Sequence, residues 1–259
     1  MTLIVDRGDD GVAVLTLNVP ERRNAMTAEL TAAWRDALRT LAADTGVRAV
    51  VVTGAGPAFC AGGDLSWIGA GNTLSVAEIR DRMLPFYRTW LAVRELEVPV
   101  LAAVNGPAVG AGLALALACD LRYAAENAVF SAPFTQLGMN PGMATTYLLQ
   151  EAVGLPVARE LLLTGRRVEA AEALRLGLVN GVYPAMDLLA EVRAVAARIA
   201  AGAPLPVRLT TTALRAGFGT LEEALAWEAL AQPVTMASDD LREGLAAQRE
   251  KRAPRFTGR

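Results

Sequence analysis

Apolar residues in the first two thirds of the chain form short blocks that alternate with longer amphipathic segments. The short blocks predict strands at residues 11–17, 47–53, 98–104, 121–124 and 128–131. The amphipathic segments predict helices at residues 27–43, with Thr27 as N-cap, and at 76–95, 112–118 and 143–153. Alternating strands and helices are typical of an α/β fold.

The last third of the chain shows helical periodicity only. Helices are predicted at residues 186–201, 206–216, 221–230 and 239–252, with no strand between them. We therefore expect an α/β core over residues 1–200 and a helical carboxy-terminal region over residues 201–259.

Composition excludes several classes of function. The 259 residues include no histidine, which excludes Ser-His-Asp and Cys-His catalysis and histidine metal sites within one chain. A net charge of −2 gives no general attraction to nucleic acid or acidic membranes. The longest apolar run, residues 107–119, is shorter than the roughly 20 residues that span a membrane. Because the amino terminus also lacks a signal pattern, we expect a cytoplasmic protein.

The two cysteines predict neither a disulfide nor a metal cluster. Cys60 and Cys119 lie far apart in the sequence and belong to no CxxC pair. We expect two reduced cysteines that pack in the core, and no metal site.

Two glycine-rich loops follow predicted strands, GAGPAFCAGGD at 54–64 and NGPAVGAG at 105–112. The first is unlike a dinucleotide loop, because Phe59 replaces the third glycine and Pro57 lacks a backbone donor. The second opens into an apolar helix, whose first amides suit a developing oxyanion. The alternative is that Gly110 and Gly112 only allow close packing of that helix.

The two loops together resemble the paired signature of the enoyl-CoA hydratase/isomerase, or crotonase, family. The matching segments are AFCAGGDL (58–65) and NGPAVGAGLALALACDLRYA (105–124). The resemblance extends through PERRNAM (20–26), LTGRRVEAAEALRLGLVNGVYP (163–184) and REGLAAQREKRAPRF (242–256), which is nearly the whole chain. The tail is similar to that of the phenylacetate-pathway isomerases.

This resemblance implies a spiral of ββα units and a helical carboxy-terminal region that forms a homotrimer or homohexamer. It implies an acyl-CoA thioester as substrate or ligand, with no permanently bound cofactor. The backbone amides of Gly63 and Ala111 would form an oxyanion hole. The coenzyme A path would be lined by Arg23, Ala25, Ala61, Gly63 and Leu65, with Lys251 and Phe256 reaching a neighbouring subunit's ligand. For Arg23 and Lys251 the alternative is ordinary solvated surface.

The sequence departs from the family pattern at three acid/base positions. The two hydratase glutamates correspond to Ala114 and Phe134, and the acid of an isomerase subgroup corresponds to Gly142. We expect Ala114 to open volume in the pocket and Phe134 to add apolar surface. The other polar candidates are Asn140, Gln136, Tyr147, Glu78, Asp81 and Tyr87, whereas Asp64 is expected to shape its loop.

The sequence therefore leaves two functions open. One is an enzyme that stabilises a thioester enolate, most simply a double-bond isomerase or a related lyase, because isomerisation needs only one group to move a proton. The alternative is a catalytically silent acyl-CoA carrier. A covalent mechanism would need a nucleophilic carboxylate, and the family position for one is Gly142.

Overall fold

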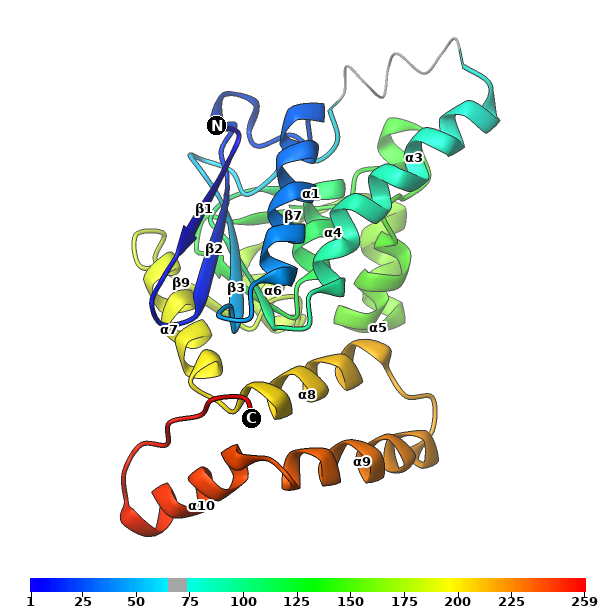
Figure 1. Cartoon of the computed structure of the whole chain (residues 1–259). Coiled ribbons are helices and arrows are strands. Elements are labelled where there is room, and N and C mark those ends of the chain that lie inside the picture. Colours follow the sequence, from blue (N-terminus) through cyan, green and yellow to red (C-terminus); the bar gives the residue numbers. More distant parts are fainter. Residues whose placement is uncertain (65–73) are drawn as a thin grey trace.

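The computed structural model describes residues 1–64 and 74–259 (Figure 1). Its main element is a six-stranded sheet in the order β1-β2-β3-β4-β6-β9. These strands are β1 (Leu3–Arg7), β2 (Val12–Leu17), β3 (Ala49–Gly54), β4 (Val100–Val104), β6 (Leu121–Ala125) and β9 (Gly181–Tyr183). Only β1 is antiparallel to its neighbour in this sheet. A second sheet joins β5 (Ala108–Val109), β7 (Val129–Ser131) and β8 (Arg167–Glu169).

Both faces of the large sheet are covered, which explains why its strands are almost continuously apolar. One face, with Leu15, Val50 and Ala102, packs in the main core with α1 (Ala28–Ala43), α3 (Val76–Leu91), α4 (Ala111–Ala118) and α5 (Thr145–Thr164). The opposite face, with Val14 and Val51, packs on α7 (Leu188–Ala200). A short helix, α6 (Ala170–Arg175), follows β8.

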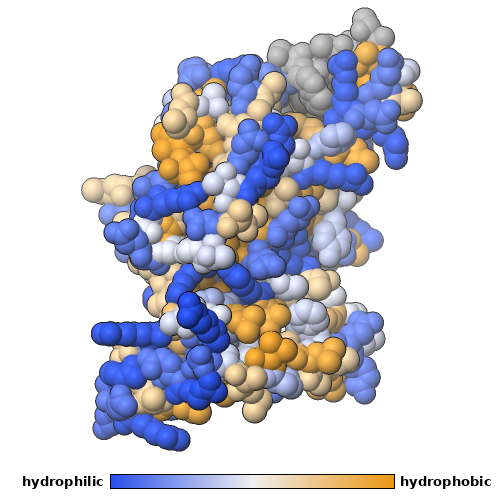
Figure 2. Space-filling view, in the orientation of Figure 1, coloured by the Kyte–Doolittle hydropathy of each residue, from blue (hydrophilic) through white to orange (hydrophobic). Residues whose placement is uncertain are grey.

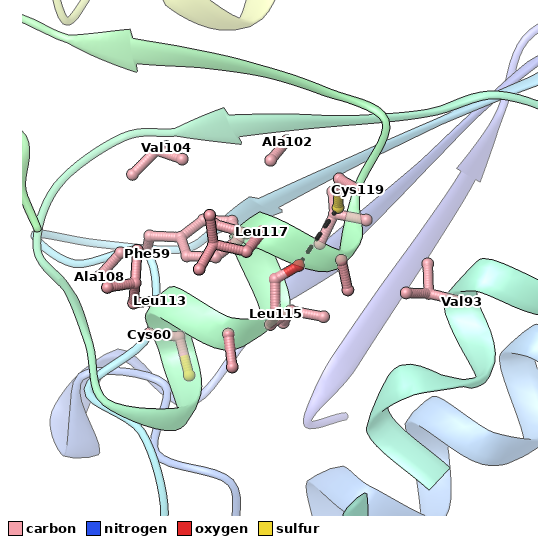
Figure 3. Packing of buried hydrophobic residues seen from close by; sticks show 14 of the residues in the cluster. Phe59, Cys60, Val93, Ala102, Val104, Ala108, Leu113, Leu115, Leu117 and Cys119 are labelled. Carbon is pink, nitrogen blue, oxygen red and sulfur yellow. Dashed lines mark hydrogen bonds between the residues drawn. The ribbon is translucent and has the colours of Figure 1, made fainter. Parts of the chain in front are cut away.

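Helix α4 lies at the centre of the main core. Seven of its eight residues are buried, and Figure 3 shows its side chains packed among those of neighbouring elements. Cys60 and Cys119 are free and buried there, and burial raises the pKa of each thiol to about 12. Both thiols therefore stay protonated, as expected for packing cysteines.

Most long elements were predicted well, and several short ones were missed. Helix α1 begins after Thr27, whose hydroxyl accepts a hydrogen bond from the Leu30 amide at 3.2 Å. Helix α5 continues beyond the predicted end at residue 153 to Thr164, with non-helical geometry at Gly154. Strands β1, β5, β8 and β9 and helix α6 were not predicted.

The carboxy-terminal part forms a separate helical layer, as predicted. It consists of α8 (Pro204–Ala216), α9 (Leu221–Met236) and α10 (Asp239–Glu250), which lie below the core in Figure 1. The chain end returns to this layer, where the Asp239 amide donates to the Arg259 carbonyl at 2.7 Å. Within the described residues no helix is long and apolar enough to cross a membrane.

Candidate active site

A cavity of about 510 Å³ lies between α3, the start of α4 and two loops, residues 61–63 and 133–143. Its wall brings together seven of the residues proposed from the sequence, namely Ala61, Gly63, Tyr87, Ala111, Phe134, Asn140 and Gly142. They come from segments far apart in the chain, so the fold is what assembles them.

The two glycine-rich loops are hydrogen-bonded to each other along their backbones. The Cys60 amide donates to the Pro107 carbonyl at 3.2 Å, and the Val109 amide donates to the Cys60 carbonyl at 3.0 Å. A β-carbon at Gly112 would overlap the Cys60 backbone, so glycine is needed there for α4 to approach the first loop. Gly112 therefore does allow close packing of α4. The same close packing brings the two loops together at one site.

Two backbone amides at this junction, those of Gly63 and Ala111, have no acceptor among the described residues. A β-carbon placed on Gly62 would overlap the Val109 carbonyl and lie 3.3 Å from the Ala111 nitrogen, so a side chain there would prevent this close approach of the loops. Ala111 is the first residue of α4, where the helix dipole favours negative charge.

The first loop is held in place by the residues that follow β2. Asn24 is fully buried; its side-chain oxygen accepts from the Val19 amide at 2.9 Å, and its nitrogen donates to the carbonyls of Ala55 and Ala58 at 2.9 and 2.8 Å. The Ala61 amide donates to the Arg23 carbonyl at 2.9 Å. Arg23 and Ala25 therefore border the loop, but they do not line the cavity.

Most of the polar candidates lie outside the cavity. Glu78 completes the capping box of Ser75 at the start of α3, and hydrogen bonds from the Ser75 hydroxyl and amide lower its pKa. Asp81 faces Arg80 at the surface, and Gln136 donates to the Thr164 carbonyl at 2.6 Å. Tyr147 is 60% exposed on α5. These four are not part of the cavity wall.

Asp64 belongs to the first loop rather than to the cavity wall. Its carboxylate accepts a hydrogen bond from the Arg22 guanidinium at 2.9 Å. This contact fits the loop-shaping role expected of it.

Besides Asn140, Tyr87 is the polar candidate that the structure brings into the cavity wall. It is half-buried on α3, and burial raises the pKa of its phenol. A β-carbon at Gly142 would overlap its hydroxyl, so the side chain packs directly on that glycine.

The three positions that carry acids in the family contribute no carboxylate here. Phe134 and Gly142 line the cavity, and Phe134 adds an apolar ring as expected. Ala114 is fully buried in the core and is not part of the wall, so the expected opening at this position is absent. Among the described wall residues there is no carboxylate, and Arg82 is the one charged side chain.

Sequence reasoning missed most of the cavity wall contributed by α3. Ile79, Arg82, Met83 and Phe86 all face the cavity together with Tyr87. Their spacing of three, four, seven and eight residues is that of one helical face, and this signal was present in the sequence.

Lys251 and Phe256 do not line this cavity within one chain. Leu65 lies outside the described residues. Lys251 is the C-cap of α10 and Phe256 lies in the tail that follows, so both belong to the carboxy-terminal layer (Figure 1). No cluster of metal-binding side chains occurs among the residues whose positions are described.

The family model "Enoyl-CoA hydratase/isomerase" matches residues 7–259. The chain belongs to the enoyl-CoA hydratase/isomerase family. A relative from Thermus thermophilus, named as an enoyl-CoA hydratase, is 44% identical over 247 residues, covering 95% of this chain and 97% of the relative. The crotonyl-CoA hydratase of Syntrophomonas wolfei is 36% identical over 255 residues, covering 98% of this chain and 97% of the relative.

Solved structures of the enoyl-CoA hydratase/isomerase family confirm the fold expected from the resemblance. The crystal structure of an enoyl-CoA hydratase from Bacillus anthracis matches all of this chain and all of that chain, with a TM-score of 0.94 and 34% identity. The fold is thus the crotonase fold with its helical carboxy-terminal region. Family membership supports an enzyme of acyl-CoA chemistry. The wall residues that the structure describes include no carboxylate, which bears on the reaction.

Proposed function

We propose that this member of the family binds an enoyl-CoA thioester in the 510 Å³ cavity and shifts its double bond, rather than adding water. The observation that carries the proposal is a wall whose described residues include two backbone amides without an acceptor and no carboxylate. Hydration needs one group to activate water and another to deliver a proton. Isomerisation through an enolate can use a single proton carrier.

In this proposal the thioester oxygen accepts hydrogen bonds from the Gly63 and Ala111 amides. Charge that develops on this oxygen as the enolate forms would be stabilised by both donors and by the α4 dipole. The coenzyme A portion would follow the backbone at Arg23, Ala25, Ala61 and Leu65. Lys251 and Phe256 would reach the ligand of a neighbouring copy.

The oxyanion hole can be tested by removing one amide hydrogen. In Ala111→Pro the donor is lost, although proline is well tolerated at the first position of a helix. We expect kcat for 3-enoyl-CoA isomerisation to fall about 10²–10³-fold. Ala111→Gly keeps the donor and should retain most of the activity. Equal activity in both variants would exclude Ala111 as an oxyanion donor.

The missing carboxylates also favour the second candidate, a catalytically silent acyl-CoA carrier. One experiment distinguishes the two functions. The protein is incubated in D₂O with 3-enoyl- and saturated acyl-CoA thioesters, which are then followed by mass spectrometry. Double-bond movement or deuterium at the α-carbon supports the enzyme. Tight binding with neither change supports the carrier.

We further propose that the chain forms a homotrimer, alone or stacked into a homohexamer. The support is α9, a helix rich in apolar residues of which none is buried within the single chain. A second copy of the chain is the proposed occupant of this surface.

A further inference from the structure

Tyr87 brings a phenol hydroxyl to the wall of the cavity. Tyr87 lines the cavity from α3, and its ring lies 6.1 Å from that of Phe86, centroid to centroid. Within the described part of the chain, its hydroxyl makes no hydrogen bond. A polar group in an apolar wall usually finds a partner, so a ligand atom is a natural one.

This hydroxyl lies where a side chain at position 142 would begin. A β-carbon on Gly142 would be 2.9 Å from Tyr87 Cζ and nearer still to its Oη. By the family resemblance, Gly142 is the position of the acid in an isomerase subgroup. Gly142 has no side chain, and the Tyr87 hydroxyl occupies the space that a side chain there would fill.

Few other groups in the cavity can exchange a proton. Among the described wall residues Arg82, on the same helix as Tyr87, is the only other one with a titratable side chain. The loops at residues 61–63 and 133–143 and the start of α4, which complete the wall, present none. An arginine stays protonated and cannot serve as a base.

We propose that Tyr87 Oη is the proton carrier of the isomerisation, moving one proton between the α- and γ-carbons of the acyl chain. This inference rests on the proposed function and names the group that the family's acid positions do not supply. Ionised Tyr87 takes the α-proton, and the electron pair of the broken C–H bond moves into a dienolate held by the Gly63 and Ala111 amides. The same hydroxyl then gives its proton to the γ-carbon, the α,β double bond and thioester carbonyl form, and the phenolate is regenerated.

The reaction's pH dependence follows from this role. The phenol is held in its neutral form by burial, which raises its pKa above the usual value. The active, ionised fraction therefore grows as pH rises, and kcat should increase about tenfold per pH unit through the neutral range. A tyrosine that only packs against Gly142 would produce no such slope.

The experiment compares wild type with Tyr87→Phe, Tyr147→Phe and Gly142→Ala, using 3-hexenoyl-CoA in D₂O. Tyr87→Phe keeps the ring, so the binding constant for 3-hexenoyl-CoA and the thermal midpoint should stay near wild type while kcat falls about 10²–10⁴-fold and its pH slope disappears. Gly142→Ala should also lower kcat, because its methyl group displaces the hydroxyl. Tyr147→Phe removes a hydroxyl outside the cavity and should behave as wild type.

The outcomes separate this proposal from the proposed function. If wild type isomerises the probe and Tyr87→Phe does so at the same rate, Tyr87 is not the proton carrier and the proposed function stands. If wild type binds the probe without conversion or α-exchange, both proposals are wrong. Should Tyr87→Phe fail to fold, full activity of a folded Gly142→Ala variant would overturn the assignment by itself.

Discussion

Asn24 joins the first glycine-rich loop to the rest of the core. Its side chain is fully buried and is hydrogen-bonded to the Val19 amide and to the carbonyls of Ala55, Ala58 and Phe59. The Met26 amide, two residues later, donates to the Gly62 carbonyl at 2.8 Å. The Gly63 amide is thus positioned by buried polar contacts rather than by a helix or a long strand.

Replacing the Asn24 side chain should destabilise the protein and leave the first glycine-rich loop less firmly held. Asn24→Ala leaves several buried backbone groups without a partner, and each such group costs about 1–3 kcal/mol. We expect a clear drop in the free energy of unfolding, measured by urea denaturation. Asn18→Ala is the matched control, because Asn18 makes an exposed hydrogen bond to the Met1 carbonyl. Equal effects of the two substitutions would contradict the role given to Asn24.

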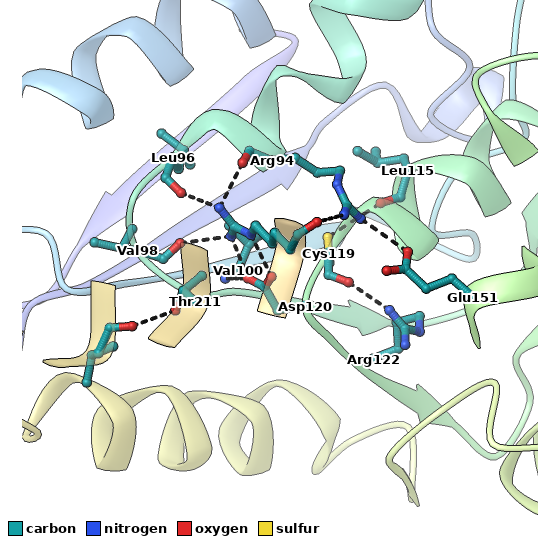
Figure 4. Close-up of polar contacts among 12 residues, drawn as sticks. Arg94, Leu96, Val98, Val100, Leu115, Cys119, Asp120, Arg122, Glu151 and Thr211 are labelled. Atoms are coloured by element: carbon teal, nitrogen blue, oxygen red, sulfur yellow. Dashed lines mark hydrogen bonds and ion pairs between the residues drawn. The ribbon is translucent and has the colours of Figure 1, made fainter. Parts of the chain in front are cut away.

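Among the secondary-structure elements, α8 is linked to the core by Arg215. This arginine donates to both carboxylate oxygens of Asp120, at 2.7 and 2.6 Å, and to the carbonyls of Arg94, Leu96 and Val98. Figure 4 shows Asp120 close to the backbone carbonyls of Arg94, Leu96 and Val98. The side chains of Arg215 and Asp120 are only 11% and 22% exposed. Arg215 therefore provides hydrogen-bond donors for the carbonyls between α3 and β4. It also attaches the helical layer to the core.

Truncating this arginine should weaken the attachment of α8. Arg215→Ala leaves a largely buried carboxylate and several carbonyls unpaired, so we expect a loss of roughly 3 kcal/mol in the free energy of unfolding. Arg7→Ala breaks the exposed pair of Arg7 with Asp44 and should cost less than about 1 kcal/mol. Urea unfolding of both variants measures the contrast. A similar loss of unfolding free energy in both variants would mean that burial of the Arg215–Asp120 pair adds little to stability.

The carboxy-terminal layer leaves a large apolar surface on the single chain. In α9, Leu221 and Leu230 are each 75% exposed and Met236 is 60% exposed. Figure 2 shows apolar side chains gathered over α8 and α9, whereas much of the remaining visible face is polar. Exposed apolar side chains gathered on one layer are typical of an interface.

We expect substitutions on α9 to change the assembly state. Leu230→Glu places a charge in the proposed interface between copies and should shift a homotrimer or homohexamer toward smaller species in light scattering coupled to size exclusion. Met186→Glu is the control, since Met186 is 89% exposed and precedes α7, outside the helical layer. A wild-type protein that is monomeric at all concentrations would contradict the proposal.

The sequence by itself determined the parts of this protein that depend on local pattern. Apolar periodicity predicted the long helices and the buried parallel strands, because a face that must be buried repeats along each element. The two glycine-rich loops pointed to the family, and the absence of histidine limited the chemistry. Short strands such as β5 and β8, of two and three residues, carry too little pattern to be predicted.

The tertiary structure decided which polar residues share the cavity. The sequence offered Tyr87, Tyr147, Glu78 and Asp81 as candidates beside Asn140, and of these only Tyr87 and Asn140 line the wall. Ala114 is buried instead of opening the pocket. The direction of a side chain depends on how its helix packs against distant segments, here α3 against residues 133–143. Because those contacts are made between residues far apart in the chain, no local pattern could specify them.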